Sequence, residues 1–174
     1  DNSQAQKIKF AENETKTFVN SLPFNLTNDQ RKTAWQIISD LQKTRPMNRL
    51  LEGEVGSGKT MVATLAMLNV ALANFQSVLM APTEILASQH YKTINNLLKA
   101  TGLKVALLTR SQQLINNQPV SKKKIIDDLK AGLIKIVVGT HALIQEKIEF
   151  NNLAFAIIDE QHRFGVDQRK ALRE

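Results

Sequence analysis

Short apolar runs alternate with longer amphipathic segments along most of the 174-residue chain. Apolar runs of four to six residues predict β-strands at residues 49–52, 77–81, 103–108, 133–138 and 153–158. Helical periodicity and capping residues predict helices at residues 27–41, 59–74, 82–100 and 121–130. Strands that alternate with helices in this way predict an α/β fold, in which helices cover both faces of a parallel sheet.

Two polar segments lie outside this alternation. Residues 1–21 are expected to be either a helical linker from an absent N-terminal domain or a frayed end. Residues 109–118 lack periodicity and are expected to form a loop. Residues 22–174 are therefore predicted to form the main domain.

Polar signatures follow four of the predicted strands. They occupy residues 53–60, 82–84, 139–141 and 159–162. Ligands of open parallel sheets bind at the carboxyl ends of the strands, so these segments are expected to meet at one edge. Their convergence predicts a single functional edge.

The first of these segments matches the phosphate-binding pattern G-x-x-x-x-G-K-[ST]. Glycines let backbone amides approach phosphate oxygens closely, and Lys59 supplies a mobile positive charge for the outer phosphates. Lys59 is therefore a predicted catalytic residue, together with Glu160. The Thr60 hydroxyl can bind Mg²⁺, and a predicted helix begins at the same place. The predicted nucleotide-binding residues of this loop are Gly53, Glu54, Val55, Gly56, Ser57, Gly58, Lys59 and Thr60.

Asp159 and Glu160 follow the last predicted strand. The Asp159 carboxylate can hold the Mg²⁺ that Thr60 also faces, and Glu160 can orient or deprotonate a water molecule. The pair could instead cap the next helix. A nucleotide hydrolase fits this arrangement better than a small-molecule kinase, because no acceptor site is evident in the sequence.

Gln30 and two hydroxyl residues each allow two interpretations. Gln30 stands three residues after Thr27, which is capping-box spacing, but its amide could also recognise adenine. Thr83 and Thr140 could cap helices or could contact a nucleic-acid backbone. The candidate DNA-contacting residues are Pro82, Thr83, Glu84, Thr140 and His141.

Composition narrows the class of protein. The formal net charge is +7, which favours polyanionic partners. There is no cysteine, so thiol nucleophiles and cysteine-bound zinc are excluded. No apolar run is long enough to cross a membrane and no leader segment is evident, so we expect a cytoplasmic protein. The lysine run at residues 122–124 is expected to be a solvated helix start.

Together these motifs resemble the first RecA-like motor domain of superfamily-two helicases. Gly53–Thr60 corresponds to motif I, and residues 159–162 (Asp159, Glu160, Gln161 and His162) correspond to motif II. Residues 24–30, 81–84 and 138–141 resemble the Q motif and two DNA-contacting motifs. This comparison favours adenine recognition by Gln30 and a role for His162 in coupling the γ-phosphate site to neighbouring segments.

Within the superfamily, the chain resembles the RecG family of branched-DNA translocases. The similar segments are residues 55–60, 81–86, 89–90 and 157–166. The transcription-repair coupling factor is the alternative relative, although it usually carries phenylalanine and glutamate where this chain has Ser57 and Gln161.

The resemblance implies an ATP-dependent and Mg²⁺-dependent DNA helicase or translocase that acts on forks and Holliday junctions. It also implies a second RecA-like lobe and an N-terminal wedge domain, neither of which matches any part of these 174 residues. A P-loop enzyme acting on a small molecule and a non-catalytic nucleotide-gated DNA-binding module are the other hypotheses. The presence of Lys59, Asp159 and Glu160 argues against a non-catalytic module.

Overall fold

The computed structural model describes residues 8–43, 47–51, 58–145 and 148–159. Within these residues seven strands form one sheet in the order β1-β7-β2-β6-β3-β4-β5. The first five of that order run parallel, and β4 and β5 are antiparallel additions at one edge. The strands are β1 Met47–Leu51, β2 Gln76–Ala81, β3 Val105–Leu108, β4 Gln113–Ile115, β5 Gln118–Pro119, β6 Ile136–Thr140 and β7 Leu153–Asp159.

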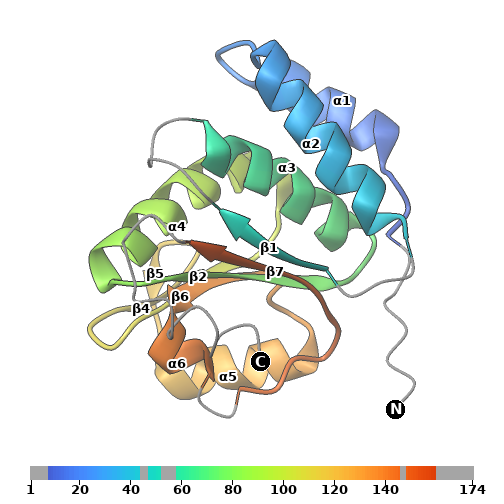
Figure 1. Ribbon diagram of the computed structural model, residues 1–174. Helices are drawn as coiled ribbons and strands as arrows, with labels where there is room; N and C mark the ends of the chain where they lie inside the picture. The colour runs from blue at the N-terminus through green and yellow to red at the C-terminus, as the bar shows by residue number, and fades with distance from the viewer. Residues whose placement is uncertain (1–7, 44–46, 52–57, 146–147, 160–174) are drawn as a thin grey trace.

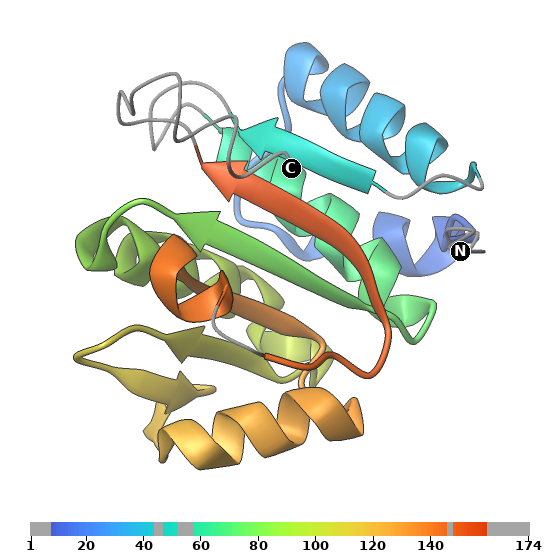
Figure 2. The same cartoon turned by 60° about the horizontal axis from the view of Figure 1, so that its bottom comes forward.

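Helices cover both faces of this sheet, as the sequence predicted. Figures 1 and 2 show α3 and α4 on one face, with α1 and α2 outside α3, and α5 and α6 on the other face. The helices are α1 Glu12–Ser21, α2 Asn28–Leu41, α3 Lys59–Leu72, α4 Glu84–Leu98, α5 Lys122–Ala131 and α6 His141–Gln145. A short 3₁₀ turn, Lys99–Thr101, continues α4.

Helix α3 is the centre of the larger hydrophobic core. Ala66, Met67 and Val70 are fully buried, because α2 and α4 flank this helix while β2 and β7 lie beneath it. A helix that is apolar on all sides is typical of such a buried position. This explains why the sequence in this segment lacks an evident polar face.

The segment before the main domain is packed against α3. Ile8 is buried, and the Asn69 side chain of α3 accepts a hydrogen bond from the Ala11 backbone N–H at 2.9 Å. Asn69 also bonds to the buried Thr15 hydroxyl. Residues 8–21 are therefore folded onto the domain and not frayed, while their origin as a linker from another domain stays a prediction.

The prediction of a loop over residues 109–118 is wrong in part. It contains β4 and β5, a hairpin whose turn residues Asn116 and Asn117 have φ angles of 47° and 69°. Asparagine tolerates this left-handed region better than most residues. The strands have three and two residues, so they are too short to show an apolar alternation. The Tyr91 hydroxyl of α4 accepts from the Asn117 backbone N–H at 2.7 Å and so holds the turn.

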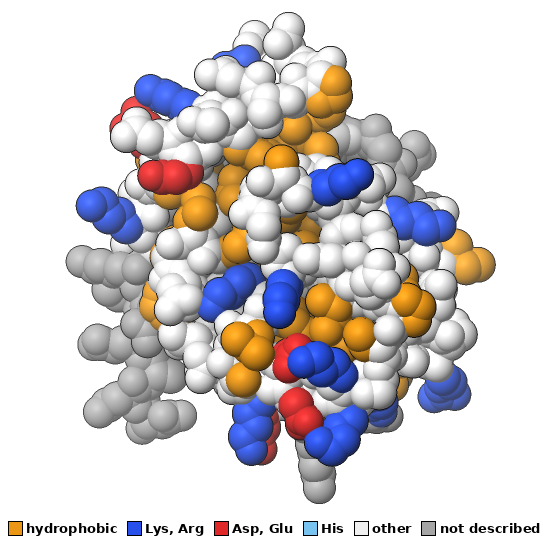
Figure 3. All heavy atoms as spheres, turned by 180° about the vertical axis from the view of Figure 1, so that it is seen from behind, with side chains coloured by type: hydrophobic (Ala, Val, Ile, Leu, Met, Phe, Trp, Pro, Cys, Tyr) orange, Lys and Arg blue, Asp and Glu red, His pale blue; other side chains and the backbone are white. Residues whose placement is uncertain are grey.

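The positive charge of the chain is largely spread over the described surface. Figure 3 shows lysine and arginine side chains scattered across one face, with acidic side chains among them at its upper left and at its lower end. On α5, Lys123 pairs with Asp127 at 2.6 Å and Lys124 with Asp128 at 3.0 Å, which agrees with a solvated helix start. Within the described residues no helix is both long and apolar enough to span a membrane.

Gln76 generates a test of the fold. Its buried side-chain amide donates to the Leu129 and Ile134 carbonyls, both at 2.8 Å, and accepts from the Asn152 N–H at 2.8 Å. Gln76→Leu removes all three bonds, although the Leu129 carbonyl keeps the Gly132 and Asn151 N–H donors, so we expect it to lower the free energy of unfolding by about 3 kcal/mol. Urea denaturation measures this change.

Gln118→Leu is the matched control, because Gln118 is exposed. We expect it to change the free energy of unfolding by less than about 0.5 kcal/mol. Equal effects of the two substitutions would contradict the bridging role of Gln76.

Candidate nucleotide site at the carboxyl edge of the sheet

The carboxyl ends of four parallel strands meet at one edge of the sheet. In the register of the strands, Leu51 pairs with Asp159, Met80 with Ile158, and Ala81 with Thr140. The register therefore brings the end of β1, the strand that leads into the phosphate-binding loop, beside β7, the strand that carries Asp159. It also brings the two segments predicted to contact DNA beside one another.

The end of the predicted phosphate-binding loop leads into α3. Gly58 is the N-cap residue of this helix, with a φ angle of 88°, and Lys59 and Thr60 form its first turn. Lys59 is exposed, whereas Thr60 is buried. The helix N-terminus that the loop needs for binding an anion is thus present.

Several predicted site residues lie outside the described residues. These are Gly53, Glu54, Val55, Gly56 and Ser57 of the loop and Glu160, Gln161 and His162 of motif II. Their predicted roles stay predictions.

Gln30 forms the capping box that its spacing predicts. Its backbone N–H donates to the Thr27 hydroxyl at 3.1 Å, and its side-chain oxygen accepts from the Thr27 N–H at 2.8 Å. The side-chain nitrogen points to the loop and lies 3.5 Å from the Gly58 carbonyl oxygen. A Cβ at Gly58 would lie 2.1 Å from this nitrogen, so the contact requires glycine. Capping is confirmed, and adenine recognition stays a prediction.

His90 of α4 joins the two residues predicted to hold Mg²⁺. Its Nε2 atom lies 2.7 Å from Oδ2 of Asp159, and its Nδ1 atom lies 3.4 Å from Oγ1 of Thr60. All three side chains are buried. A carboxylate can only accept, so Nε2 carries the hydrogen of the shorter bond.

Sequence reasoning assigned no role to His90. The available signal was its place on α4 between Ala87, Tyr91 and Ile94, which are all buried apolar-face positions. A histidine on a buried helix face needs polar partners for its ring nitrogens. Its partners come from α3 and β7, so the helix pattern alone could not identify them.

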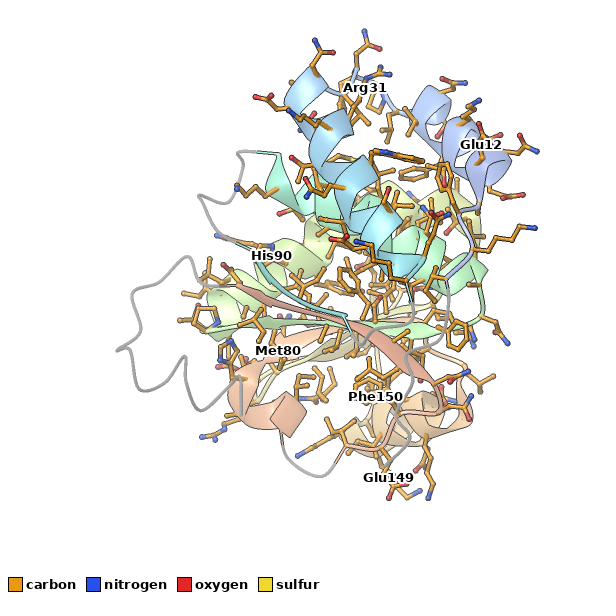
Figure 4. The ribbon with its side chains drawn as sticks, turned by 45° about the vertical axis from the view of Figure 1, so that its right-hand side comes forward. Glu12, Arg31, Met80, His90, Glu149 and Phe150 are labelled. Atoms are coloured by element: carbon orange, nitrogen blue, oxygen red, sulfur yellow. The ribbon has the colours of Figure 1, made fainter. Side chains whose placement is uncertain are left out.

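His141 is the first residue of α6, which covers the opposite face of the sheet from α4. Its ring forms a hydrogen bond with the Met80 backbone, and burial lowers its pKa below the usual range, although that bond and the Asp159 charge oppose the shift. Figure 4 shows His90 and Met80 on opposite faces of the sheet, near the same end of the strands. The predicted contact of His141 with DNA stays a prediction.

The donor set suits magnesium. Mg²⁺ prefers oxygen ligands and is usually held by one or two protein oxygens together with phosphates and water. Thr60 offers a hydroxyl and Asp159 a carboxylate, both buried at this edge. No cluster of three His, Cys, Asp or Glu residues suited to a metal occurs within the described ranges.

Thr83 acts as a helix cap. Its hydroxyl accepts from the Leu86 N–H at 3.2 Å at the start of α4. The next residue, Glu84, accepts from the Ser111 N–H at 2.7 Å and from its hydroxyl at 3.0 Å. These bonds lower the pKa of Glu84. The capping alternative for Thr83 is thus confirmed.

Pro82 and Thr140 complete the candidate DNA edge. Both are partly buried, and Thr140 is the last residue of β6. At Gly139 a Cβ would lie 2.5 Å from the Leu108 carbonyl oxygen, so glycine allows β6 to approach β3. The contacts of these residues with DNA stay predictions.

The chain is similar to known ATP-dependent helicases over nearly its whole length. It is 50% identical to ATP-dependent DNA helicase RecG of Aquifex aeolicus, over 98% of this chain and 21% of that protein. It is 46% identical to RecG of Bacillus subtilis, over 98% of this chain and 24% of that protein. The chain thus spans about a fifth to a quarter of the length of these relatives.

Solved structures agree with this similarity. A structure of RecG bound to a three-way DNA junction matches with a TM-score of 0.79 and 45% identity, over 94% of this chain and 22% of that one. A hypothetical ATP-dependent RNA helicase from Sulfolobus tokodaii matches in fold, with a TM-score of 0.59 and 16% identity, over 94% of this chain and 54% of that one. The resemblance to RecG and the RecA-like fold are confirmed.

The family model for DEAD/DEAH box helicases matches residues 27–174. That segment contains the capping box of α2, the phosphate-binding loop and both partners of His90. The chain belongs to the DEAD/DEAH box helicase family.

Proposed function

We propose that this chain is the nucleotide-binding half of the motor of an ATP-dependent DNA helicase. The substrate of the whole protein is branched DNA, such as replication forks and Holliday junctions, in recombination and repair. The observation that carries this proposal is the high identity with RecG proteins across nearly the whole chain. The matching RecG structure contains a three-way DNA junction, which supports branched DNA as the partner.

ATP binds at the carboxyl edge of the sheet. The loop amides and Lys59 hold the phosphates at the N-terminus of α3, and Gln30 reads the adenine edge. Thr60 and Asp159 hold Mg²⁺, which when bound neutralises charge on the phosphate oxygens. Glu160 accepts the proton of the attacking water molecule.

DNA contacts the same edge of the sheet beside the nucleotide. Backbone amides at the first turn of a helix are suitable partners for phosphates, and α4 begins with Pro82-Thr83-Glu84. Thr140 and His141 lie at the end of the neighbouring strand, β6. These contacts are to the backbone, so they position the protein without reading the sequence of the DNA.

The rest of the motor lies outside these residues. The relatives are about four to five times as long as this chain. We infer that the additional residues form a second RecA-like lobe with an arginine finger and an N-terminal wedge domain. Residues 1–21 would link the wedge domain to the motor. The relatives are bacterial, and bacterial DNA lies in the cytoplasm, so we propose that location.

Lys59→Ala tests the nucleotide site. Lys59 is exposed and leaves the core untouched, so we expect the free energy of unfolding to change by less than about 0.5 kcal/mol. Loss of a charged hydrogen bond to phosphate should weaken ATP binding roughly 10-fold or more. Calorimetric titration with ATP measures this. Lys99→Ala is the control, since Lys99 is exposed at the far end of α4, and unchanged affinity in Lys59→Ala would refute the phosphate assignment.

Glu160→Gln separates binding from chemistry in the protein that carries both lobes. Glutamine keeps the shape of the side chain but cannot accept the proton of water, so turnover should fall about 10²–10⁴-fold while ATP still binds. Steady-state ATPase assays and ATP titrations measure the two effects. Glu149→Gln is the control, because the Glu149 side chain is 72% exposed and beside Lys130. Loss of ATP binding along with turnover would mean that Glu160 is a structural residue or a metal ligand.

The 174-residue chain on its own should fold but hydrolyse ATP very slowly. An arginine finger contributes about 10³–10⁵ to the rate, and we assign it to the second lobe. We also expect weak, strongly salt-dependent DNA binding and no unwinding, because the proposed contacts of this chain are to the DNA backbone alone. ATPase and unwinding assays on the purified chain decide this. Hydrolysis at the rate of the two-lobed protein, stimulated by DNA, would show that the two-lobe interpretation is wrong.

A further inference from the structure

His90 lies between two oxygen-bearing side chains that are far apart in the sequence. It stands 30 residues after Thr60 and 69 residues before Asp159, and it contacts both of them. The ring is 1% exposed, so water cannot replace either partner. Both partners, Thr60 and Asp159, are residues that we propose bind Mg²⁺.

The hydrogen-bonding capacity of the ring fixes its orientation. The Asp159 carboxylate accepts from Nε2–H at 2.7 Å. When only Nε2 carries a hydrogen, the other nitrogen is an acceptor, and Nδ1, which lies 3.4 Å from the Thr60 hydroxyl oxygen, can then receive the hydrogen of that hydroxyl. The hydroxyl then keeps its lone pairs for another ligand. The Asp159 carboxylate, with one oxygen held by the ring, is turned in a fixed direction.

We propose that His90 is a positioning residue that orients the Thr60 hydroxyl and the Asp159 carboxylate for the Mg²⁺ that accompanies ATP. This inference rests on the proposed function, because it concerns the same nucleotide site. A histidine that orients metal-binding oxygens acts as a partner outside the ligand shell, and loss of such a partner typically reduces metal affinity 10–100-fold.

A purely structural role explains these contacts less well. The neighbouring residue Tyr91 is also 1% exposed and also needs a polar partner, but it bonds to Asn117 on the β4–β5 turn. His90 instead joins α3 and β7, the two elements that carry motif I and motif II. Tyr91→Phe therefore provides a matched control: it removes two partly buried hydrogen bonds of the same helix without touching Thr60 or Asp159.

The test compares the Mg²⁺ dependence of ATP binding among variants of this chain. ATP is titrated at a series of Mg²⁺ concentrations and in excess chelator. We expect His90→Ala to bind ATP like the wild type in chelator but to need about 10–100-fold more Mg²⁺ for tight binding. His90→Gln should recover much of the loss, because its amide can donate to Asp159 and accept from Thr60. Tyr91→Phe should match the wild type.

A spectroscopic measurement on the wild-type chain covers the case in which His90→Ala does not fold. Nitrogen NMR of the His90 ring should show the hydrogen on Nε2. A ring with a hydrogen on Nδ1, alone or in addition to one on Nε2, would overturn the proposal, since Nδ1 could not then accept from the Thr60 hydroxyl.

The outcomes separate this inference from the proposed function. A wild-type chain without Mg²⁺-dependent ATP binding would overturn both. Normal binding by the wild type, together with an unchanged Mg²⁺ requirement in a folded His90→Ala variant, would overturn the role of His90 alone. An equal loss in Tyr91→Phe would also overturn it, because the effect would then come from a loosened α4.

Discussion

The parallel pairing of β7 with both β1 and β2 is the constraint on which the candidate site depends. β7 is the last strand of the described chain, but it lies between two strands that come much earlier. In this register Asp159 stands beside Leu51, the residue at the end of the strand that leads into the phosphate-binding loop. Side chains alternate between the two faces of a strand, so a shift of one residue would turn Asp159 to the opposite face. Pairing over five residues of β1 therefore sets where the Asp159 carboxylate lies, which we propose binds Mg²⁺.

Burying Asp159 places a second demand on the fold. A carboxylate that is 1% exposed loses its hydration, and this costs stability unless hydrogen bonds replace the water. His90 supplies one such bond. The ring of His141, which is hydrogen-bonded to the Met80 backbone, interacts electrostatically with Asp159. Helix α4 must consequently lie close to β7 at this point. The cap at Thr83 fixes where that helix begins, and so which of its residues reaches the carboxylate.

Local patterns in the sequence predicted most of the elements but not the contacts between them. The parallel strands and the capping box of Thr27 and Gln30 follow from short-range spacing, and the described structure has them within a few residues. The phosphate-binding loop was predicted in the same way, but most of it lies outside the described residues. The bonds of His90 and Gln76 join elements far apart in the chain, so no local pattern contains them. The β4–β5 hairpin was not predicted because strands of three and two residues are too short to show an apolar alternation. The sequence feature that indicated its turn was the pair Asn116-Asn117.

The chemistry of imidazole explains why a histidine suits the position between Thr60 and Asp159, the two residues that we propose bind Mg²⁺. An arginine there could also bond to Asp159, but its guanidinium is always charged and would compete with Mg²⁺ for the carboxylate. An imidazole can donate to the carboxylate while remaining neutral, so the negative charge of Asp159 stays available to a cation. It can also accept from the Thr60 hydroxyl through its second nitrogen, which neither lysine nor arginine can do. The residue type thus matches a site that must be held in shape before the cation arrives, without supplying a permanent positive charge of its own.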